Sequence, residues 1–232
     1  MEKISVSIVI PCYNEFLNLK HLVEECKETA KDNPNYNIEF IFVDNGSTDN
    51  SSIFLREITH PNIRVFNIQE NIGYGNGIIQ GLKRCSNETV AWTHSDLQTD
   101  VRDIVNGLKY INNGQSLIKG KRVSRKLLAK SLSLGMSIYT YFKLGFWINE
   151  INAQPKIFKK EFLNEIINMA PLDFSLDLYF CIEAKKREGI KEFNVYFKKR
   201  KHEEAKGGGG SLKQKIRIIK RTISYINKLS TK

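Results

Sequence analysis

Short apolar runs alternate with amphipathic segments through the first hundred residues of the chain. Four of these runs are rich in Val, Ile or Phe and lead into polar residues: SVSIVIPCY (5–13), IEFIFVDNGS (38–47), IRVFNIQE (63–70) and TVAWTHSD (89–96). The segments between them have apolar residues at helical spacing, most clearly over residues 14–31. Strands separated by helices predict an α/β fold with a mostly parallel central sheet flanked by helices.

The predicted strands end in polar sequence. These ends read PCYNE (11–15), VDNGSTD (43–49), QENIGYG (69–75) and HSDLQ (94–98). In open parallel sheets the ligand lies beyond the carboxyl ends of the strands, so four polar ends together predict a binding site at that edge. The glycines of NIGYGNG (71–77) lack the GxGxxG spacing of a dinucleotide loop, and a tight strand-to-helix turn with close backbone packing explains them.

Length and composition favour one domain, or one domain with an appendage, in a chain of 232 residues. The four cysteines form no CxxC pair, which favours a reducing compartment and argues against a structural zinc site. The sequence starts with a strand pattern, and we expect no signal peptide. The formal charge of +11 is concentrated in residues 196–232, where 12 Lys or Arg and 2 Glu give +10; the first 195 residues carry +1.

Two segments in the second half of the chain carry open alternatives. Residues 127–148 are the nearest approach to a membrane span, but Lys130 and Lys143 interrupt them; they predict either a buried helix or a membrane-facing helix near an acceptor site. A glycine-rich hinge (207–211) precedes a basic amphipathic helix (212–232). This helix either lies on an anionic membrane through residues 212–229 or packs against the body of the protein. No reader motif accompanies its charge, so nucleic-acid binding is not expected.

In this order, SIVIPCYNE (7–15), VDNGSTD, NIGYGNG and HSDLQ resemble the motifs of inverting family 2 glycosyltransferases with the GT-A fold. The likeness is to the dolichol-phosphate-mannose synthase-like and polyprenyl-phosphate sugar synthase group. GKR (120–122), INAQPKIFKKE (151–161) and FKKRKHEEAKGG (197–208) resemble later elements of that group. The resemblance covers most of residues 4–210 and implies a catalytic domain over residues 1–206.

The resemblance implies a role for particular residues on the donor side. Pro11, Tyr13 and Glu15 stand where the family holds the base and ribose of the nucleotide, and Asp44 where it reads the base. Asp96 matches the second acid of the DxD element, which acts in catalysis and binds both nucleotide and metal.

Gln98 follows Asp96 near the metal and the diphosphate, and a Mg²⁺ or Mn²⁺ ion is implied. The cationic positions expected around the phosphates are Arg122, Arg200 and Lys206. A divalent ion with Arg or Lys stabilises the charge that develops on a leaving nucleoside diphosphate.

His94 stands where the family has the first acid of DxD. It could ligate the metal through a neutral imidazole, hydrogen-bond a donor phosphate or sugar hydroxyl, or only fill space. If His94 acts, activity should fall as it protonates around its ordinary pKa of about 6.5. Glu150 and the residues after it stand where the family has Asp-x-x-Ser-Gly-Phe. The acceptor side of the site therefore departs further from the family than the donor side does.

The acceptor decides whether a general base is needed. Asp177 lies where relatives carry a late acid, and it is either a catalytic base or a capping or salt-bridged helix residue. A phosphomonoester acceptor has a second pKa of about 6 and is already a nucleophile at neutral pH. Arg122 and Arg125 could clamp such a phosphate, or they could belong to a solvated basic loop.

The function that the resemblance implies is metal-dependent, inverting transfer of a hexose from a nucleotide-sugar donor to a lipid-linked acceptor, preferably polyprenyl phosphate. Transfer to a sugar hydroxyl of lipopolysaccharide or another cell-surface polysaccharide is the alternative. A non-catalytic nucleotide-sugar binding module is the second alternative. The expected location is cytoplasmic, with peripheral attachment to the inner face of the membrane as a further expectation.

Overall fold

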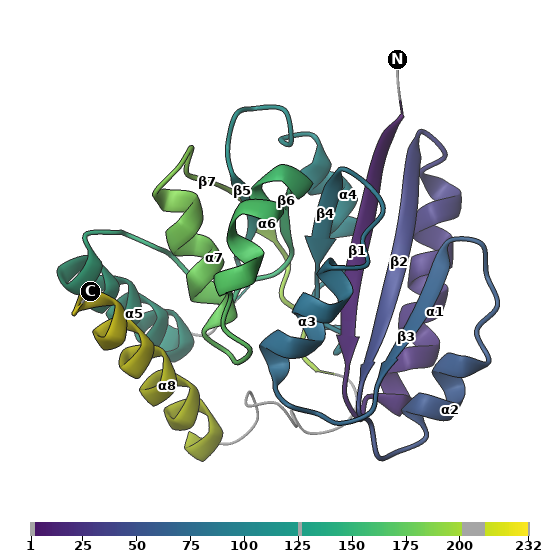
Figure 1. Cartoon of the computed structure of the whole chain (residues 1–232), viewed down its shortest axis with the longest axis horizontal. Helices are drawn as coiled ribbons and strands as arrows, with labels where there is room; N and C mark the ends of the chain where they lie inside the picture. Colours follow the sequence, from purple (N-terminus) through teal and green to yellow (C-terminus); the bar gives the residue numbers. More distant parts are fainter. Residues whose placement is uncertain (1–2, 125–126, 201–211, 232) are drawn as a thin grey trace.

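The computed structural model describes residues 3–124, 127–200 and 212–231. A seven-stranded sheet with the order β3-β2-β1-β4-β6-β5-β7 runs through its middle (Figure 1). The strands are β1 (Ile4–Cys12), β2 (Tyr36–Asn45), β3 (Ile63–Ile68), β4 (Thr89–Trp92), β5 (Leu117–Arg122), β6 (Lys156–Lys159) and β7 (Ile190–Val195). The helices are α1 (Phe16–Asp32), α2 (Ser51–Arg56), α3 (Tyr74–Leu82), α4 (Arg102–Leu108), α5 (Leu127–Leu144), α6 (Lys160–Ile166), α7 (Leu176–Lys185) and α8 (Leu212–Ser230), with a short 3₁₀ helix over Ile167–Met169.

The prediction of a mostly parallel α/β sheet is confirmed. β1 pairs in parallel with β2 and β4, β2 with β3, and β5 with β7. β6 alone among the described strands is antiparallel, to both β4 and β5. The carboxyl ends of the other six strands therefore share one edge of the sheet.

Helices cover both faces of the sheet because the strands bury side chains on both sides. Along β1, Val6, Ile8 and Ile10 face one core cluster and Val9 faces the other, as the two-residue period of a strand requires. The first cluster receives residues of α1, α2 and α4, and the second receives residues of α3, α6, α7 and α8. The structure is thus a three-layer α/β sandwich.

The turn between β3 and α3 approaches the loop before α7 very closely. A Cβ atom on Gly75 would lie 2.7 Å from the carbonyl oxygen of Asp173, and Gly73 has a φ of 141°, which side-chain-bearing residues rarely adopt. The backbone N–H of Asn76 donates to the carbonyl of Leu172 at 2.9 Å. Close backbone packing therefore explains these glycines, as the sequence predicted.

Helices α5 and α8 lie side by side at one end of the molecule (Figure 1). Ile226 of α8 is fully buried, and the Tyr139 hydroxyl of α5 donates to Asn227 at 2.6 Å. The alternative in which the C-terminal helix packs against the body is thus the one found for this part of α8. The predicted hinge (207–211) lies outside the described residues. No helix within the described ranges is long and apolar enough to cross a membrane.

Candidate functional site

The loops that follow β1, β2 and β4 are joined by hydrogen bonds at the carboxyl edge of the sheet. Asn14, in the left-handed conformation at φ 54°, donates its backbone N–H to Ser47 at 3.0 Å and accepts from the backbone N–H of Thr48 at 2.7 Å. The Ser95 hydroxyl donates to the carbonyl of Pro11 at 2.9 Å. The predicted strand ends therefore form one connected surface.

Asp44, at the end of β2, is 1% exposed and shapes the loop that follows it. One carboxylate oxygen accepts the backbone N–H of Ser47 at 3.0 Å, and the other accepts the hydroxyl of Ser52. Base recognition by Asp44 stays a prediction, as does nucleotide binding by Pro11 and Tyr13, which lie at the same edge.

Arg200 joins two carboxylates that are far apart in the sequence. Its guanidinium donates to Glu15, and its other terminal nitrogen lies 3.8 Å from Asp96. Burial raises the pKa of Glu15 above its ordinary value, and Arg200 opposes that shift. Arg200 thus links the segments that follow β1 and β4, and phosphate binding by it stays a prediction.

Gln98 holds the segment that carries Arg200. The side-chain amide of Gln98 donates to the backbone carbonyl of Lys198 at 3.3 Å, and the backbone carbonyl of Gln98 accepts the backbone N–H of Lys198 at 2.8 Å. Asp96 in turn accepts the backbone N–H of Gln98 at 3.1 Å. The structure thus gives Gln98 a positioning contact, and metal ligation by it stays a prediction.

His94 shares a hydrogen bond with Tyr74, a residue that the sequence did not identify as part of the site. Its Nε2 lies 2.9 Å from the Tyr74 hydroxyl, and Tyr74 stacks on Phe174 with ring centroids 4.6 Å apart. Burial lowers the pKa of His94 below its ordinary value, against the opposing charges of Asp96 and Asp177. The imidazole is therefore neutral at pH 7, and its protonation lies below the pH expected from the sequence. The sequence signal that could have identified Tyr74 is its position in QENIGYG (69–75), one of the polar segments at the ends of the predicted strands.

Asp177 forms a buried ion pair with Lys156, also missed from the sequence. The side chains are 2% and 0% exposed, and Gln154 donates to the same carboxylate oxygen at 3.0 Å. Asp177 also helps to raise the pKa of Tyr74, after the larger effect of burial. The salt-bridged alternative predicted for Asp177 is thus what the structure has, and its role as a base stays a prediction.

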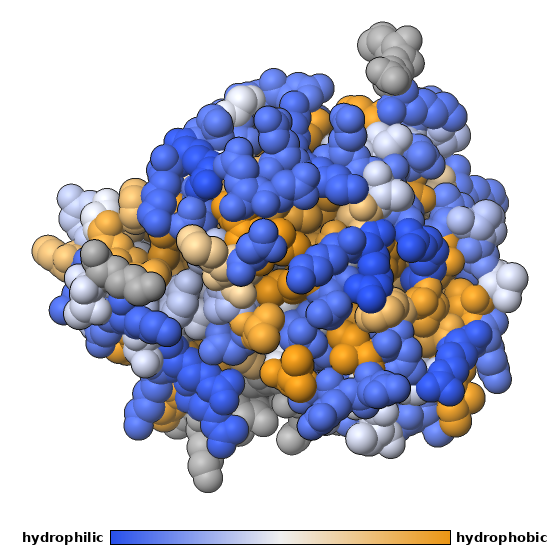
Figure 2. All heavy atoms as spheres, viewed as in Figure 1, coloured by the Kyte–Doolittle hydropathy of each residue, from blue (hydrophilic) through white to orange (hydrophobic). Residues whose placement is uncertain are grey.

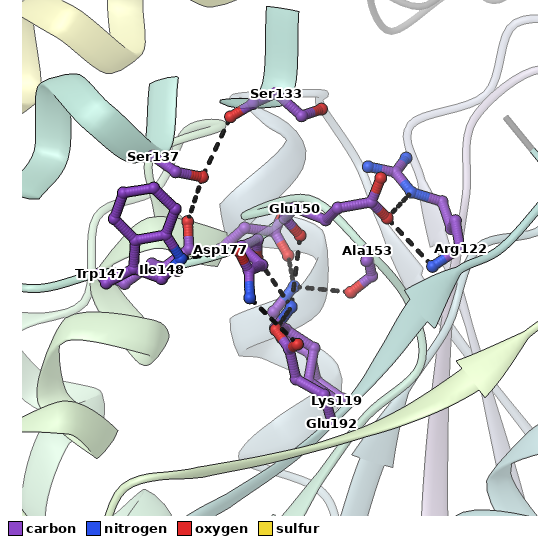
Figure 3. Close-up of polar contacts among 12 residues, drawn as sticks. Lys119, Arg122, Ser133, Ser137, Trp147, Ile148, Glu150, Ala153, Asp177 and Glu192 are labelled. Atoms are coloured by element: carbon purple, nitrogen blue, oxygen red, sulfur yellow. Dashed lines mark hydrogen bonds and ion pairs between the residues drawn. The ribbon is translucent and has the colours of Figure 1, made fainter. Parts of the chain in front are cut away.

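Arg122 ends β5 and is held by Glu150 (Figure 3). Both its Nε and its backbone N–H donate to one Glu150 oxygen, each at 3.0 Å. Its guanidinium lies 5.2 Å from the ring centre of Phe197. After the larger effect of burial, the positive charge of Arg122 also contributes to the lowered pKa of His94. Arg125 and Lys206, the other predicted phosphate ligands, lie outside the described residues.

Two buried lysines, Lys119 and Lys156, donate hydrogen bonds to the loop between α5 and β6; Figure 3 labels Lys119. Lys119 of β5 is fully buried; its Nζ donates to the carbonyl of Asn149 at 2.8 Å and to Glu192 at 3.0 Å. Lys156 of β6 is its direct cross-strand neighbour and donates to the carbonyl of Ala153 at 3.1 Å. These bonds fix the backbone on either side of Glu150.

A divalent ion would have few protein ligands here. Within the part of the chain that is described, no three His, Cys, Asp or Glu side chains are grouped to hold a metal ion. Asp96 and His94, two residues apart, offer one carboxylate and one imidazole. Mg²⁺ is commonly held by one or two carboxylates together with substrate phosphates. The residues therefore fit an ion whose coordination is completed by a bound diphosphate.

The order of the strands and the polar carboxyl edge define a GT-A-like fold. Glucosyl-3-phosphoglycerate synthase from Mycobacterium tuberculosis, solved with Mn²⁺, UDP and phosphoglyceric acid, superposes with a TM-score of 0.72 at 16% identity, over 97% of this chain and 78% of that one. Staphylococcus aureus TarS 1–349 with UDP-GlcNAc gives a TM-score of 0.66 at 17% identity, over 96% of this chain and 66% of that one.

The chain belongs to glycosyl transferase family 2, whose family model matches residues 7–168. It is 25% identical to dolichyl-phosphate beta-glucosyltransferase ALG5D of Trichomonas vaginalis over 96% of this chain and 74% of the relative. It is 29% identical to the glycosyltransferase YkcC of Bacillus subtilis over 53% of this chain and 38% of the relative. It is 30% identical to the undecaprenyl-phosphate 4-deoxy-4-formamido-L-arabinose transferase of Proteus mirabilis over 54% of this chain and 39% of the relative. The matched region is therefore less than half the length of the last two relatives.

Proposed function

We propose that this chain is an inverting, metal-dependent hexosyltransferase that moves a sugar from a nucleotide-sugar to polyprenyl phosphate. The observation that carries the proposal is the pair of arginines at the carboxyl edge. Arg200 lies 3.8 Å from Asp96, and Arg122 lies at the carboxyl end of β5, at the same edge of the sheet. One arginine would meet the donor diphosphate and the other the acceptor phosphate. Two of the relatives described above carry dolichyl phosphate or undecaprenyl phosphate in their names.

The donor would lie over the loops after β1, β2 and β4. Pro11, Tyr13, Glu15 and Asp44 would hold its base and ribose. Asp96, with His94 or Gln98, would hold Mg²⁺ or Mn²⁺ against the diphosphate, and the ion would stabilise the charge on the leaving nucleoside diphosphate. Because Nε2 of His94 is bonded to Tyr74, His94 would contact a ligand through Nδ1.

The acceptor phosphate would lie against Arg122. One of its oxygens would attack the anomeric carbon as the bond from that carbon to the diphosphate oxygen breaks, and the configuration inverts. No proton has to be removed from a phosphate that is already ionised. To reach Arg122, the phosphate would displace or share the Glu150 carboxylate, which bonds the same Nε.

The alternative acceptor, a sugar hydroxyl, would need a base. Asp177 is the candidate from the sequence, but its side chain is 2% exposed and paired with Lys156. A carboxylate that is already neutralised by a buried ammonium is poorly placed to accept a proton from an incoming hydroxyl. This contact favours the phosphate acceptor. In this proposal residues 1–206 form the catalytic domain, and 212–232 a basic amphipathic extension after the hinge (207–211).

A product assay tests the proposal. The purified chain is incubated with Mn²⁺ or Mg²⁺, UDP-, GDP- and dTDP-sugars and a short polyprenyl phosphate, and lipid products are identified by mass spectrometry. We expect a polyprenyl-phosphate sugar that requires the divalent ion. Asp96→Asn should lower kcat by about 10²–10³-fold, the scale for losing a group that stabilises developing charge. Donor binding without turnover by the wild type would instead support the non-catalytic binding module.

A further inference from the structure

The outer face of α5 exposes several large apolar side chains. The row, called the α5 apolar face below, consists of Leu127, Leu134, Ile138, Tyr141 and Phe142, together with Trp147 just beyond the helix. The residues within the helix recur at steps of seven, four, three and one, which places them on one side. Their exposed fractions run from 40% to 84%. Exposed apolar surface of this extent marks an interaction site.

The far end of the α5 apolar face is aromatic. Tyr141 contacts Phe142 and Trp147, with ring centroids 5.8 Å and 6.2 Å apart. Trp147 donates its indole N–H to the Asn149 side chain at 2.9 Å. Trp and Tyr are enriched at the boundary between lipid headgroups and acyl chains, where one part of the ring system is wet and another is apolar.

Helix α8 supplies positive charge next to this face. The C-terminal part of its apolar side is already used, because Ile226 is fully buried and Tyr225 and Leu229 pack against the core; Ile216, nearer the start of the helix, is 44% exposed. Its exposed residues include Arg217, Lys220, Arg221 and Lys228. Figure 2 shows hydrophobic side chains at the end of the molecule where Figure 1 places α5, with hydrophilic side chains below them along α8. An apolar surface beside a cationic one complements an anionic bilayer.

The α5 apolar face is connected to the proposed acceptor site at both ends. Leu127 is five residues after Arg122, and the loop after Trp147 returns Glu150 to Arg122. The Ser137 hydroxyl of α5 donates to the carbonyl of Ile148 at 2.6 Å, so helix and loop are also joined directly (Figure 3). A bilayer against this face would therefore lie close to Arg122.

We propose that the α5 apolar face docks on an anionic lipid bilayer, with its aromatic end in the headgroup region and the basic residues of α8 against the anionic headgroups. This inference deepens the proposed function, on which it rests for its purpose, because a lipid-linked phosphate would reach Arg122 from that surface. The sequence left a membrane contact open for residues 127–148 and for the C-terminal helix; the proposal assigns it chiefly to α5, because the end of the apolar stripe of α8 packs against the core.

Intrinsic fluorescence and vesicle sedimentation together test the docking. The full chain has two tryptophans, and Trp92 is fully buried while Trp147 is 43% exposed, so a change of emission on adding vesicles reports Trp147. The vesicles are phosphatidylglycerol with phosphatidylcholine, or phosphatidylcholine alone, without donor or polyprenyl lipid. We expect co-sedimentation with the anionic vesicles and a shift of the emission to shorter wavelength.

The double variant Tyr141→Gln/Phe142→Gln should lower the partition coefficient at least about tenfold, because it removes two large apolar groups from the contact. Ile53→Gln, at a residue 60% exposed on α2, is the matched control and should bind like wild type. Lys220→Gln/Arg221→Gln should weaken binding to anionic vesicles and leave the weak binding to neutral ones unchanged.

Three results would overturn the docking proposal. They are no wild-type binding to anionic vesicles, equal binding by Tyr141→Gln/Phe142→Gln, or a stable wild-type dimer in solution that the same variant dissociates, which would assign the face to a second copy of the chain. These measurements use no substrate. Failure of the transfer assay with normal vesicle binding would therefore count against the proposed function alone.

Discussion

The two halves of the sheet build their parts of the site in different ways. In β1–β4 the buried side chains are mostly apolar; Asp44 lies at the end of β2, Asp96 lies in the loop after β4, and each accepts a backbone N–H of its own loop. In β5–β7 the strands themselves carry fully buried lysines, Lys119 and Lys156, whose carboxylate partners come from β7 and α7.

The two halves of the sheet therefore differ in how closely their site residues are tied to the core. Residues at strand ends and in loops can change with little disturbance of the apolar core, so the half of the sheet that is proposed to bind the donor carries its polar groups at little cost to stability. In the second half, the charges that fix the loop around Glu150 also form part of the core. A change there should therefore affect stability and acceptor binding together.

The largest expected effect is on stability, from Lys156→Met. Removing one partner of a buried pair leaves Asp177 uncompensated, and we expect a loss of roughly 3–5 kcal/mol in the free energy of unfolding, measured by urea denaturation. Arg64→Met is the matched change in the first half, where the pair with Glu39 has the arginine 54% exposed. It should cost under about 1 kcal/mol. Equal effects of the two changes would remove the contrast between the halves.

The pair Lys156→Met/Asp177→Leu extends that test to catalysis. Replacing both partners by apolar groups should recover much of the lost stability, because no buried charge remains unpaired. Transfer to polyprenyl phosphate should persist in this variant, since a phosphate acceptor needs no base. Complete loss of transfer in a folded double variant would return Asp177 to the role of base.

The next effect is on the acceptor, from Arg122→Gln. Losing a charged hydrogen-bond partner should raise the KM for polyprenyl phosphate about tenfold or more, with the KM for the donor changed far less. Arg102→Gln is the control, because Arg102 forms an exposed pair with Asp100 and is not among the proposed phosphate ligands. A rise in the donor KM instead would assign Arg122 to the first half of the site.

A smaller change of the opposite sign is expected from Glu150→Gln. The neutral amide competes less with an acceptor phosphate for Arg122, so the acceptor KM should fall about threefold in steady-state assays. A clear loss of kcat/KM would show that the carboxylate positions Arg122 for catalysis.

The smallest effect concerns pH. Because burial lowers the pKa of His94, its imidazole protonates at a lower pH than an ordinary histidine does. We expect the midpoint of any titration of kcat/KM that depends on His94 to lie below the ordinary value of about 6.5, by comparison of wild type with His94→Gln. A midpoint above the ordinary value that His94→Gln abolishes would contradict the placement of His94.

The sequence predicted the first half of the fold far better than the second. The strand pattern located β1–β4 to within a few residues, and the polar ends located Asp44 and Asp96, because those features depend on neighbours in sequence. The Lys156–Asp177 pair and the Tyr74–His94 hydrogen bond join residues about 20 apart, and the antiparallel strand β6 pairs with strands still further away in the sequence. Periodicity carries no information on such pairings. Helices were predicted for residues 127–148 and 212–232, but the packing of α5 against α8 was not.

The most direct test compares polyprenyl phosphate with the matching polyprenol under the same donor, ion and enzyme concentrations. The two lipids differ only in the group that Arg122 is proposed to bind. We predict that the phosphate is glycosylated and the alcohol is not, and that Arg122→Gln abolishes most of the difference. Glycosylation of the alcohol at a similar rate would contradict the phosphate acceptor.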